Sequence, residues 1–333
     1  MKQWKIILVF FSFISYKGET QSTGGITGKR DTSYTTYNAY KSTVKSHPNI
    51  QIVTEFKSSS VKEKRGIKYC SIRDRKLVLD AFYPKKKSKR NRIAILIIHG
   101  GGWRSGDRSQ HYPLAQRLAL LGYVCFTPEY RLSTEALYPA AVNDLKASLR
   151  WIHANAKKYT IDTSRIAVLG FSAGGELAAF IGSTNGNNNF EGSDCNLNFS
   201  SGVNAIVDLD GIVSFIHPES GEGDDSKRTS AATYWFGYSK KENPKLWEEA
   251  SSLTYTNNQT PPTLFINSGV DRMHAGRDDY MKNLKANNIY TDVKTFQGAP
   301  HSFPLFSPWF EPTLNYTNEF LQKLFPKKSK GNR

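Results

Sequence analysis

Ser172 is the residue of this sequence whose surroundings most clearly favour chemistry. It is the central residue of GFSAG at 170–174, a G-x-S-x-G pattern between the apolar run 166–169 and a segment rich in small residues. Where a strand turns abruptly into a helix, such a serine adopts a strained backbone conformation, and the turn needs glycine two residues away on both sides. A glycine-rich loop is the alternative interpretation. We predict that Ser172 is a nucleophile at a strand end, above the positive end of a helix.

A serine hydroxyl becomes a strong nucleophile only when a neighbouring base takes its proton. Three histidines follow Ser172 in the chain. His301 is predicted to be the base, because it comes just after the last expected strand, 291–296, and loops at strand ends form the binding edge of such sheets. His217 lies in irregular sequence, and His274 lies too close to the preferred carboxylate to come from a separate loop.

A carboxylate must hold the base in the correct tautomer, and in folds built on this serine turn it lies between the serine and the histidine in the chain. Asp271 fits this order. It follows an apolar strand expected at 263–268, and it leaves room for one helix and one strand before His301. Asp278 and Asp279 are weaker candidates, since both lie in the first turn of the next expected helix, where the helix dipole favours acidic residues.

A second glycine-rich loop could stabilise a reaction intermediate. The apolar run 93–98 ends in His99 and three consecutive glycines. Backbone N–H groups in such a turn, together with the N–H that follows the nucleophile, can bind the negative oxygen of an intermediate as an oxyanion hole. We predict that Gly101, Gly102 and Ala173 form this hole. A dinucleotide or phosphate loop is the competing interpretation, but neither of the glycine patterns typical of those loops occurs here.

Strands and helices that alternate along the chain would bring these residues together. Alternation in 67–82 predicts an antiparallel edge hairpin. Further periodicity predicts strands at 93–98, 123–128, 166–169, 203–209, 263–268 and 291–296, and helices at 110–121, 140–154, 174–182, 278–287 and 313–324. A loop is expected at 185–198 and an irregular excursion at 215–245. The repeated units predict an α/β fold, with a mostly parallel central sheet and helices on both faces.

Composition predicts one catalytic domain with extensions at both ends. Residues 1–21 are typical of an export signal, because Lys2 and Lys5 precede an apolar stretch too short to span a bilayer. We expect an N-terminal arm outside the core at 22–66, the catalytic domain at 67–326 and a basic tail at 327–333. No later segment is long and apolar enough to cross a membrane. The mature protein is therefore expected to be exported, either to the periplasm or outside the cell.

The chain is basic, with a formal net charge of +16. Ten of its positive charges lie in two runs, at 85–92 and 327–333. Neither run has interleaved aromatic residues or belongs to a nucleic-acid-binding module, so we predict solvated segments and no nucleic-acid partner. An anionic polymer or surface is the alternative attractor.

The three cysteines do not form a disulfide framework in a chain of 333 residues. Cys125 lies in an apolar stretch and is predicted to be a small core residue. Cys70 and Cys195 either pair or remain free, and the sequence does not choose between these states.

Taken together, the motifs resemble those of the α/β-hydrolase carboxylesterases. They are HGGGWRSGD at 99–107, EYRL at 129–132, YPAA at 138–141 leading to Asp144, and GFSAGG at 170–175. Over about residues 67–325 the chain is most similar to bacterial carbohydrate esterases, the branch with bifunctional feruloyl and acetyl-xylan esterases. The resemblance implies the α/β-hydrolase fold and no metal or organic cofactor. It also implies roles for six residues: Ser172 as nucleophile, Asp271 as acid, His301 as base, and Gly101, Gly102 and Ala173 at the oxyanion hole.

Two departures separate the chain from the hormone-sensitive-lipase branch. Phe171 precedes the nucleophile where that branch usually has Asp, and Asp271 is followed by Arg-Met-His rather than Pro-Leu. The resemblance implies short acyl esters, above all acetyl esters, of polysaccharides or oligosaccharides as substrates. Trp103, Tyr130 and Trp309 are candidate substrate contacts that could stack on a sugar or line an acyl pocket. Ordinary packing is the alternative for each.

Two other functions compete with this hypothesis. The first is a general short-chain carboxylesterase or lipase-like hydrolase, which the mostly polar excursion at 215–245 disfavours because it offers no apolar lid. The second is a non-catalytic protein of the same fold that binds an anionic glycan through the basic runs. A complete set of nucleophile, base, acid and oxyanion donors disfavours that reading.

Overall fold

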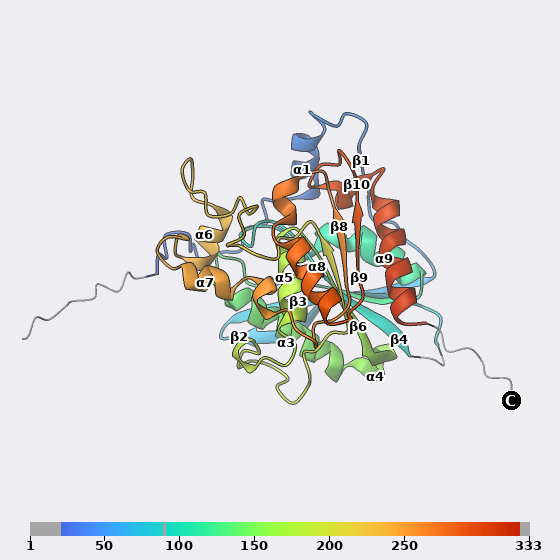
Figure 1. Cartoon of the computed structure of the whole chain (residues 1–333). Helices are drawn as coiled ribbons and strands as arrows, with labels where there is room; N and C mark the ends of the chain where they lie inside the picture. The colour runs from blue at the N-terminus through green and yellow to red at the C-terminus, as the bar shows by residue number, and fades with distance from the viewer. Residues whose placement is uncertain (1–20, 89–90, 327–333) are drawn as a thin grey trace, which may run out of the picture.

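The computed structural model describes residues 21–88 and 91–326 (Figure 1). Of the predicted export signal at 1–21, all but the last residue lies outside this part of the chain, as does the predicted basic tail at 327–333. Among the helices of the described residues, none has the length and apolar character needed to cross a membrane.

An eight-stranded sheet runs through the middle of the molecule, in the order β2-β3-β5-β4-β6-β7-β8-β9 (Figure 1). The antiparallel hairpin β2–β3 forms one edge, and β3 is antiparallel to β5, whereas β5, β4, β6, β7, β8 and β9 run parallel. The strands are β2 (Val61–Ile72), β3 (Arg75–Pro84), β4 (Arg92–Ile98), β5 (Val124–Pro128), β6 (Ile161–Phe171), β7 (Ala205–Leu209), β8 (Thr263–Asn267) and β9 (Thr291–Thr295). The predicted mostly parallel sheet is confirmed.

Helices cover both faces of the sheet. The longer ones are α2 (Tyr112–Leu120), α3 (Ala140–Ala154), α5 (Ala173–Ser183), α8 (Arg277–Ala286) and α9 (Phe310–Leu324). The shorter ones are α1 (Thr36–Thr43), α4 (Ala156–Tyr159), α6 (Ala231–Phe236) and α7 (Pro244–Glu249). Single 3₁₀ turns are η1 (Arg108–His111), η2 (Asn188–Phe190), η3 (Ser252–Tyr255), η4 (Asp271–His274) and η5 (Phe303–Leu305).

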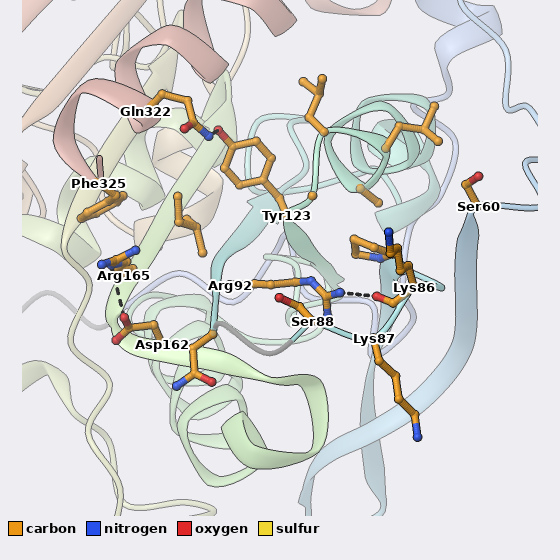
Figure 2. Close-up of a pocket in the computed structure, with 17 residues that line it drawn as sticks. Ser60, Lys86, Lys87, Ser88, Arg92, Tyr123, Asp162, Arg165, Gln322 and Phe325 are labelled. Carbon is orange, nitrogen blue, oxygen red and sulfur yellow. Dashed lines mark hydrogen bonds and ion pairs between the residues drawn. The ribbon is translucent and has the colours of Figure 1, made fainter. Parts of the chain in front are cut away.

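The amino ends of the parallel strands border a basic hollow of about 940 Å³ (Figure 2). Lys86, Lys87 and Arg92, from the first basic run, lie on its wall near the exposed apolar Leu121. The predicted solvation of this run is consistent with the exposed side chains of both lysines. This hollow opens at the end of the sheet opposite to the carboxyl ends of the strands, where the predicted site residues lie.

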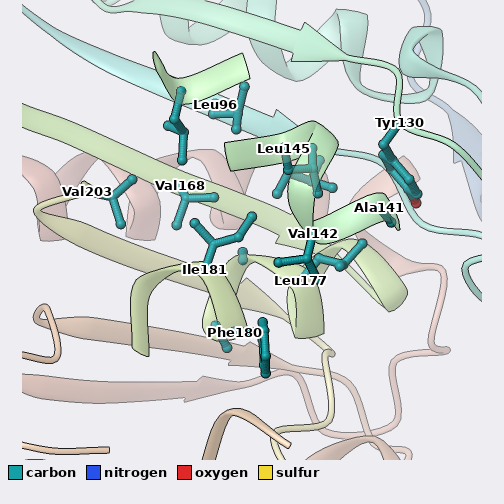
Figure 3. Packing of buried hydrophobic residues seen from close by; sticks show 14 of the residues in the cluster. Leu96, Tyr130, Ala141, Val142, Leu145, Val168, Leu177, Phe180, Ile181 and Val203 are labelled. Carbon is teal, nitrogen blue, oxygen red and sulfur yellow. The ribbon is translucent and has the colours of Figure 1, made fainter. Parts of the chain in front are cut away.

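The uninterrupted apolar strands pack on two separate layers. In β4, Leu96 and Ile98 contact the layer that contains α3 and α5, part of which Figure 3 shows. Ile95 and Ile97 contact the layer that contains α2 and α9. A strand buried on both faces needs apolar residues at every position, since successive side chains point to opposite faces. The sheet is therefore a rigid platform for the loops at its carboxyl edge.

The N-terminal arm differs from its prediction, because it is not wholly outside the core. Ala39 of α1 is buried in the layer with α2 and α9. The short strand β1 (Gln51–Ile52) pairs with β10 (Phe306–Ser307), just after the predicted base. Apolar side chains at 39, 50 and 52 give the arm a face to bury. The arm thus braces the loop that carries His301.

The cysteines behave partly as predicted. Cys125 is free and buried, as expected. Cys70 and Cys195, which the sequence left open, form a disulfide that ties the edge strand β2 to the asparagine-rich loop. This link fixes a long surface loop to the sheet.

Candidate active site

The turn from β6 to α5 presents Ser172 at the carboxyl edge of the sheet. Ser172 has φ +56°, a left-handed conformation that is strained for a residue with a side chain. A Cβ atom at Gly170 would lie 1.8 Å from the carbonyl oxygen of Gly174, and one at Gly174 would lie 2.3 Å from that of Ile98. Both glycines are therefore required by close backbone approach, as the G-x-S-x-G pattern predicts.

His301 reaches the serine from the loop after β9. Its Nε2 atom lies 2.8 Å from Ser172 Oγ, a distance at which the hydroxyl can donate to the ring. The imidazole ring also packs at 5.0 Å from the ring of Phe171. The predicted contact between Ser172 and His301 is thus present in the structure.

The carboxylate on the far side of the histidine is Asp210. Its Oδ2 atom accepts a hydrogen bond from His301 Nδ1 at 2.9 Å, and the side chain is fully buried. Asp210 directly follows β7 and has φ +55°. Its Oδ1 atom accepts from the backbone N–H of Ser268 at 2.7 Å. A left-handed turn and a backbone donor from the next strand therefore aim this carboxylate at the imidazole.

The prediction of Asp271 as the acid is wrong in this structure. Asp271 starts the 3₁₀ turn η4 and is exposed. The strand β8 ends at Asn267, and the loop beyond it turns where Gly269 N–H donates to the carbonyl of Ala299 at 3.0 Å. His301 Nδ1 contacts Asp210 and not Asp271. The sequence did contain the signal for Asp210, because that aspartate also follows an apolar strand and precedes a glycine.

The serine and histidine open into a cavity of about 640 Å³. Of the three predicted oxyanion residues, Gly102 and Ala173 line this cavity, and Gly101 does not. Gly101 instead closes the turn: its carbonyl accepts from Arg104 and Ser105 N–H, and a Cβ there would lie 1.9 Å from the carbonyl oxygen of Ser105. The structure thus places two of the three residues beside the nucleophile.

The glycine turn is supported from behind by aromatic and charged groups. The ring of Tyr130 stacks on His99 at 4.5 Å, and its hydroxyl donates to the carbonyl of His99. Arg30, from the N-terminal arm, donates to the carbonyls of Tyr130 at 3.1 Å and Gly106 at 3.3 Å. Burial and the nearby Arg30 charge lower the pKa of His99 to about 3, so this ring is neutral.

The three predicted substrate contacts have different positions. Trp103 lines the cavity, but it is buried. One face of its ring stacks on Trp235 at 5.0 Å, so that face is not free to bind a sugar. Tyr130 is fully buried behind the glycine turn and does not line the cavity. Trp309 packs edge-on against His47, also away from the cavity wall. Packing, the alternative interpretation, therefore explains Tyr130 and Trp309.

The cavity has a mixed chemical character that the sequence did not reveal. Ile212 and Met273 give it an apolar part, and Tyr234 lies on its wall beneath the guanidinium of Arg104. The cavity is also lined by charged side chains, namely those of Arg104, Glu222, Asp224, Arg228 and Arg272. Glu176 is buried in the same wall. Tyr234, Glu222, Asp224 and Arg228 come from the excursion at 215–245, whose fold was not predicted.

Within residues 21–88 and 91–326, no cluster of three or more His, Cys, Asp or Glu side chains is arranged to hold a metal ion.

This fold and site define an α/β-hydrolase, with a Ser–His–Asp arrangement at the carboxyl edge of a mostly parallel sheet. The BD-FAE family matches residues 79–276, and the chain belongs to this family. The resemblance to carboxylesterases of the carbohydrate-esterase branch is confirmed.

Individual relatives agree with this assignment. Esterase LipC of Mycobacterium tuberculosis is 28% identical over 245 residues, which cover 68% of this chain and 57% of LipC. A bifunctional GH43-CE protein of Bacteroides eggerthii shares the fold with a TM-score of 0.67 and 24% identity, over 79% of this chain and 38% of that chain. A truncated carbohydrate esterase from gut microbiota has a TM-score of 0.66 and 22% identity, over 80% and 99%. The chain thus spans little more than half of LipC.

Proposed function

We propose that this protein is a serine carboxylesterase that removes short acyl groups, acetyl above all, from polysaccharides or oligosaccharides. The observation that carries the proposal is the continuous chain of contacts from Ser172 Oγ through His301 to Asp210, at the mouth of a cavity lined by Gly102 and Ala173. Membership of the BD-FAE family and the similarity to an esterase support the reaction class.

The geometry suggests how the reaction would run. His301 Nε2 takes the proton of Ser172 as the serine oxygen attacks the ester carbonyl. The negative oxygen that forms is stabilised by the backbone N–H groups of Gly102 and Ala173. His301 then gives its proton to the departing alcohol, which leaves an acyl group on Ser172. A water molecule activated by His301 hydrolyses this acyl-enzyme and regenerates the serine.

Asp210 has the role that was predicted for Asp271. Its carboxylate accepts a hydrogen bond from the Nδ1–H of His301, which leaves Nε2 free to act as the base. It also stabilises the positive imidazolium that forms when His301 takes the serine proton. Because Asp210 is buried, this interaction is only weakly screened by water.

A polysaccharide substrate and export fit the remaining observations. The cavity opening is rich in charged and polar side chains rather than covered by an apolar lid. One similar structure is a carbohydrate esterase. Acetylated polysaccharides lie outside the cell, and the predicted signal at 1–21 would deliver the protein there.

The proposal is tested by Ser172→Ala. The variant should keep the fold, since Ala is smaller than Ser, and release no acetate from acetylated xylan, whereas the wild type releases it. Acetate and ferulate release across a panel of native acylated polysaccharides would identify the sugar and the acyl group. Wild-type turnover in Ser172→Ala would contradict the mechanism.

A general short-chain carboxylesterase is the second candidate function. The apolar Ile212 and Met273 in the cavity favour it. A series of p-nitrophenyl esters separates the two functions, because a preference for longer acyl chains over acetyl favours the general esterase. Failure of a fluorophosphonate probe to label the pure protein would instead support a non-catalytic glycan-binding role.

A further inference from the structure

Glu176 is a carboxyl group in the cavity wall that the proposed reaction does not use. It lies in the first turn of α5, and its backbone N–H donates to the carbonyl of Ser172 at 3.0 Å. It is only 1% exposed, yet it lines the cavity with Ser172 and His301.

The two carboxyl oxygens of Glu176 have different surroundings. Oε2 accepts a hydrogen bond from Trp103 Nε1 at 2.9 Å. Trp103 is held in place by its stacking on Trp235. Oε1 is buried and has no hydrogen-bond partner in the part of the chain that the structure describes. A buried polar atom without a partner is uncommon in native proteins and calls for an explanation.

The surroundings also set the charge of this carboxyl group. Burial raises the pKa of Glu176 well above its ordinary value. The hydrogen bond from Trp103 opposes this rise, and the nearby carboxyl group of Asp208 adds to it. Burial therefore favours the protonated form of this carboxyl group more than it is favoured in an exposed glutamate. Because Oε2 already accepts from Trp103 Nε1, Oε1 is the oxygen left to form a hydrogen bond with a bound molecule.

We propose that Glu176 is a specificity-determining residue, whose Oε1 forms a hydrogen bond with a hydroxyl group of the alcohol part of the ester. The inference rests on the proposed esterase function and deepens it. Glu176 selects esters whose alcohol bears a further hydroxyl group, such as acetylated sugars, over esters of alcohols without a second polar group. A buried hydrogen-bonding group rejects a substrate that leaves it unpaired, whereas an apolar wall does not.

The test compares two substrates in matched variants. Glu176→Met removes the hydrogen bond and keeps the approximate length of the side chain, and Glu176→Gln keeps a group that can donate and accept. The measured quantity is the ratio of kcat/KM for an acetylated xylo-oligosaccharide to kcat/KM for p-nitrophenyl acetate, whose alcohol has no hydroxyl to offer. We expect Glu176→Met to lower this ratio by about tenfold or more, and Glu176→Gln to keep it within about threefold.

The controls separate this inference from the proposed function. Asp271→Asn is an acid-to-amide change at an exposed position outside the cavity, and it should leave the ratio unchanged. If Glu176→Met does not fold, Glu176→Ala takes its place. An unchanged ratio in an active Glu176→Met or Glu176→Ala variant would overturn the inference alone. Absence of Ser172-dependent hydrolysis of both esters by the wild type would overturn the proposed function and the inference with it.

Discussion

The acid of the proposed triad comes from a residue whose backbone is strained. Asp210 has φ +55°, and its turn is held by two buried contacts. Asp208 Oδ1 accepts from the N–H of Gly211 at 2.6 Å, and Ser268 N–H donates to Asp210. Non-glycine residues in this conformation are uncommon and are often found at functional sites. The strained backbone of Asp210 is thus consistent with a need to point its carboxylate at His301.

Asp210→Asn should lower kcat strongly. The amide has the same shape, but it cannot stabilise the imidazolium and can favour the wrong tautomer of His301. By comparison with other serine hydrolases, we expect a loss of about 10⁴ in kcat with little change in KM. Steady-state kinetics on p-nitrophenyl acetate would measure both constants.

Asp271→Asn serves as the matched comparison. It should keep nearly all of the activity, because Asp271 is exposed and makes no contact with His301. The reverse pattern, with an active Asp210→Asn and an inactive Asp271→Asn, would restore the prediction made from the sequence.

The sequence could predict Ser172 and His301 but could not choose the acid. The serine is identified by glycines that the turn requires, and the histidine by elimination. Asp210 and Asp271 both follow buried strands, β7 and β8, which are parallel neighbours whose carboxyl ends meet at one edge. The choice depends on backbone direction after each strand, which local hydrophobic patterns do not encode.

At the scale of elements, the regular β-α units were predictable and the connecting segments were not. The helix α6 is only six residues long, between its N-cap Ser230 and the left-handed Gly237. Such a helix is too short for a periodic pattern. Strand β2 begins at Val61, earlier than predicted. Its first half is an exposed edge with charged residues and no hydrophobic alternation, so the sequence pattern did not reveal it. Tertiary contacts therefore define these elements.

The N-terminal arm is predicted to support catalysis through Arg30. Its guanidinium donates to backbone carbonyls around the glycine turn and lies 3.7 Å from the carboxylate of Glu129. Arg30→Ala would leave these acceptors unpaired. We expect a loss of about 1–3 kcal/mol in the free energy of unfolding and a lower kcat. Urea unfolding and p-nitrophenyl acetate kinetics test this prediction.

Two substitutions make the Arg30 result interpretable. Arg30→Lys keeps the charge but loses the forked geometry, so it should restore only part of the stability. Lys29→Ala removes an exposed neighbouring charge and should change neither quantity. Equal effects of Lys29→Ala and Arg30→Ala would point to the arm's net charge instead of its specific contacts.

At the scale of the whole molecule, two buried histidines make stability depend on pH. Burial lowers the pKa of His111 to about 3, and His99 has a similarly low pKa. In the unfolded chain both would titrate near pH 6.5. Their contribution to stability is therefore fully present above pH 6.5 and is lost as the pH falls towards 3, because only the unfolded state takes up the protons.

His111→Phe should weaken this dependence. The imidazole packs edge-on against Phe171, so a phenyl ring fits the site chemically, and it cannot take up a proton. Each buried neutral histidine lowers the free energy of unfolding by about 1.4 kcal/mol per pH unit within the window. Urea titrations at about pH 7.5, above the window, and at about pH 6 and 5, inside it, should show a shallower decline for the variant. An identical decline in both proteins would assign the acid sensitivity to other groups.

The basic hollow, which Figure 2 shows, lies at the edge of the sheet opposite to the proposed active site. These opposite positions have a practical use. Coupling the protein to an aldehyde-coated bead through Lys86 or Lys87 would point the catalytic mouth towards the bulk liquid, where a long insoluble polymer can approach it. An oriented biocatalyst therefore requires that these two lysines react ahead of other exposed ones, such as Lys29 and Lys41.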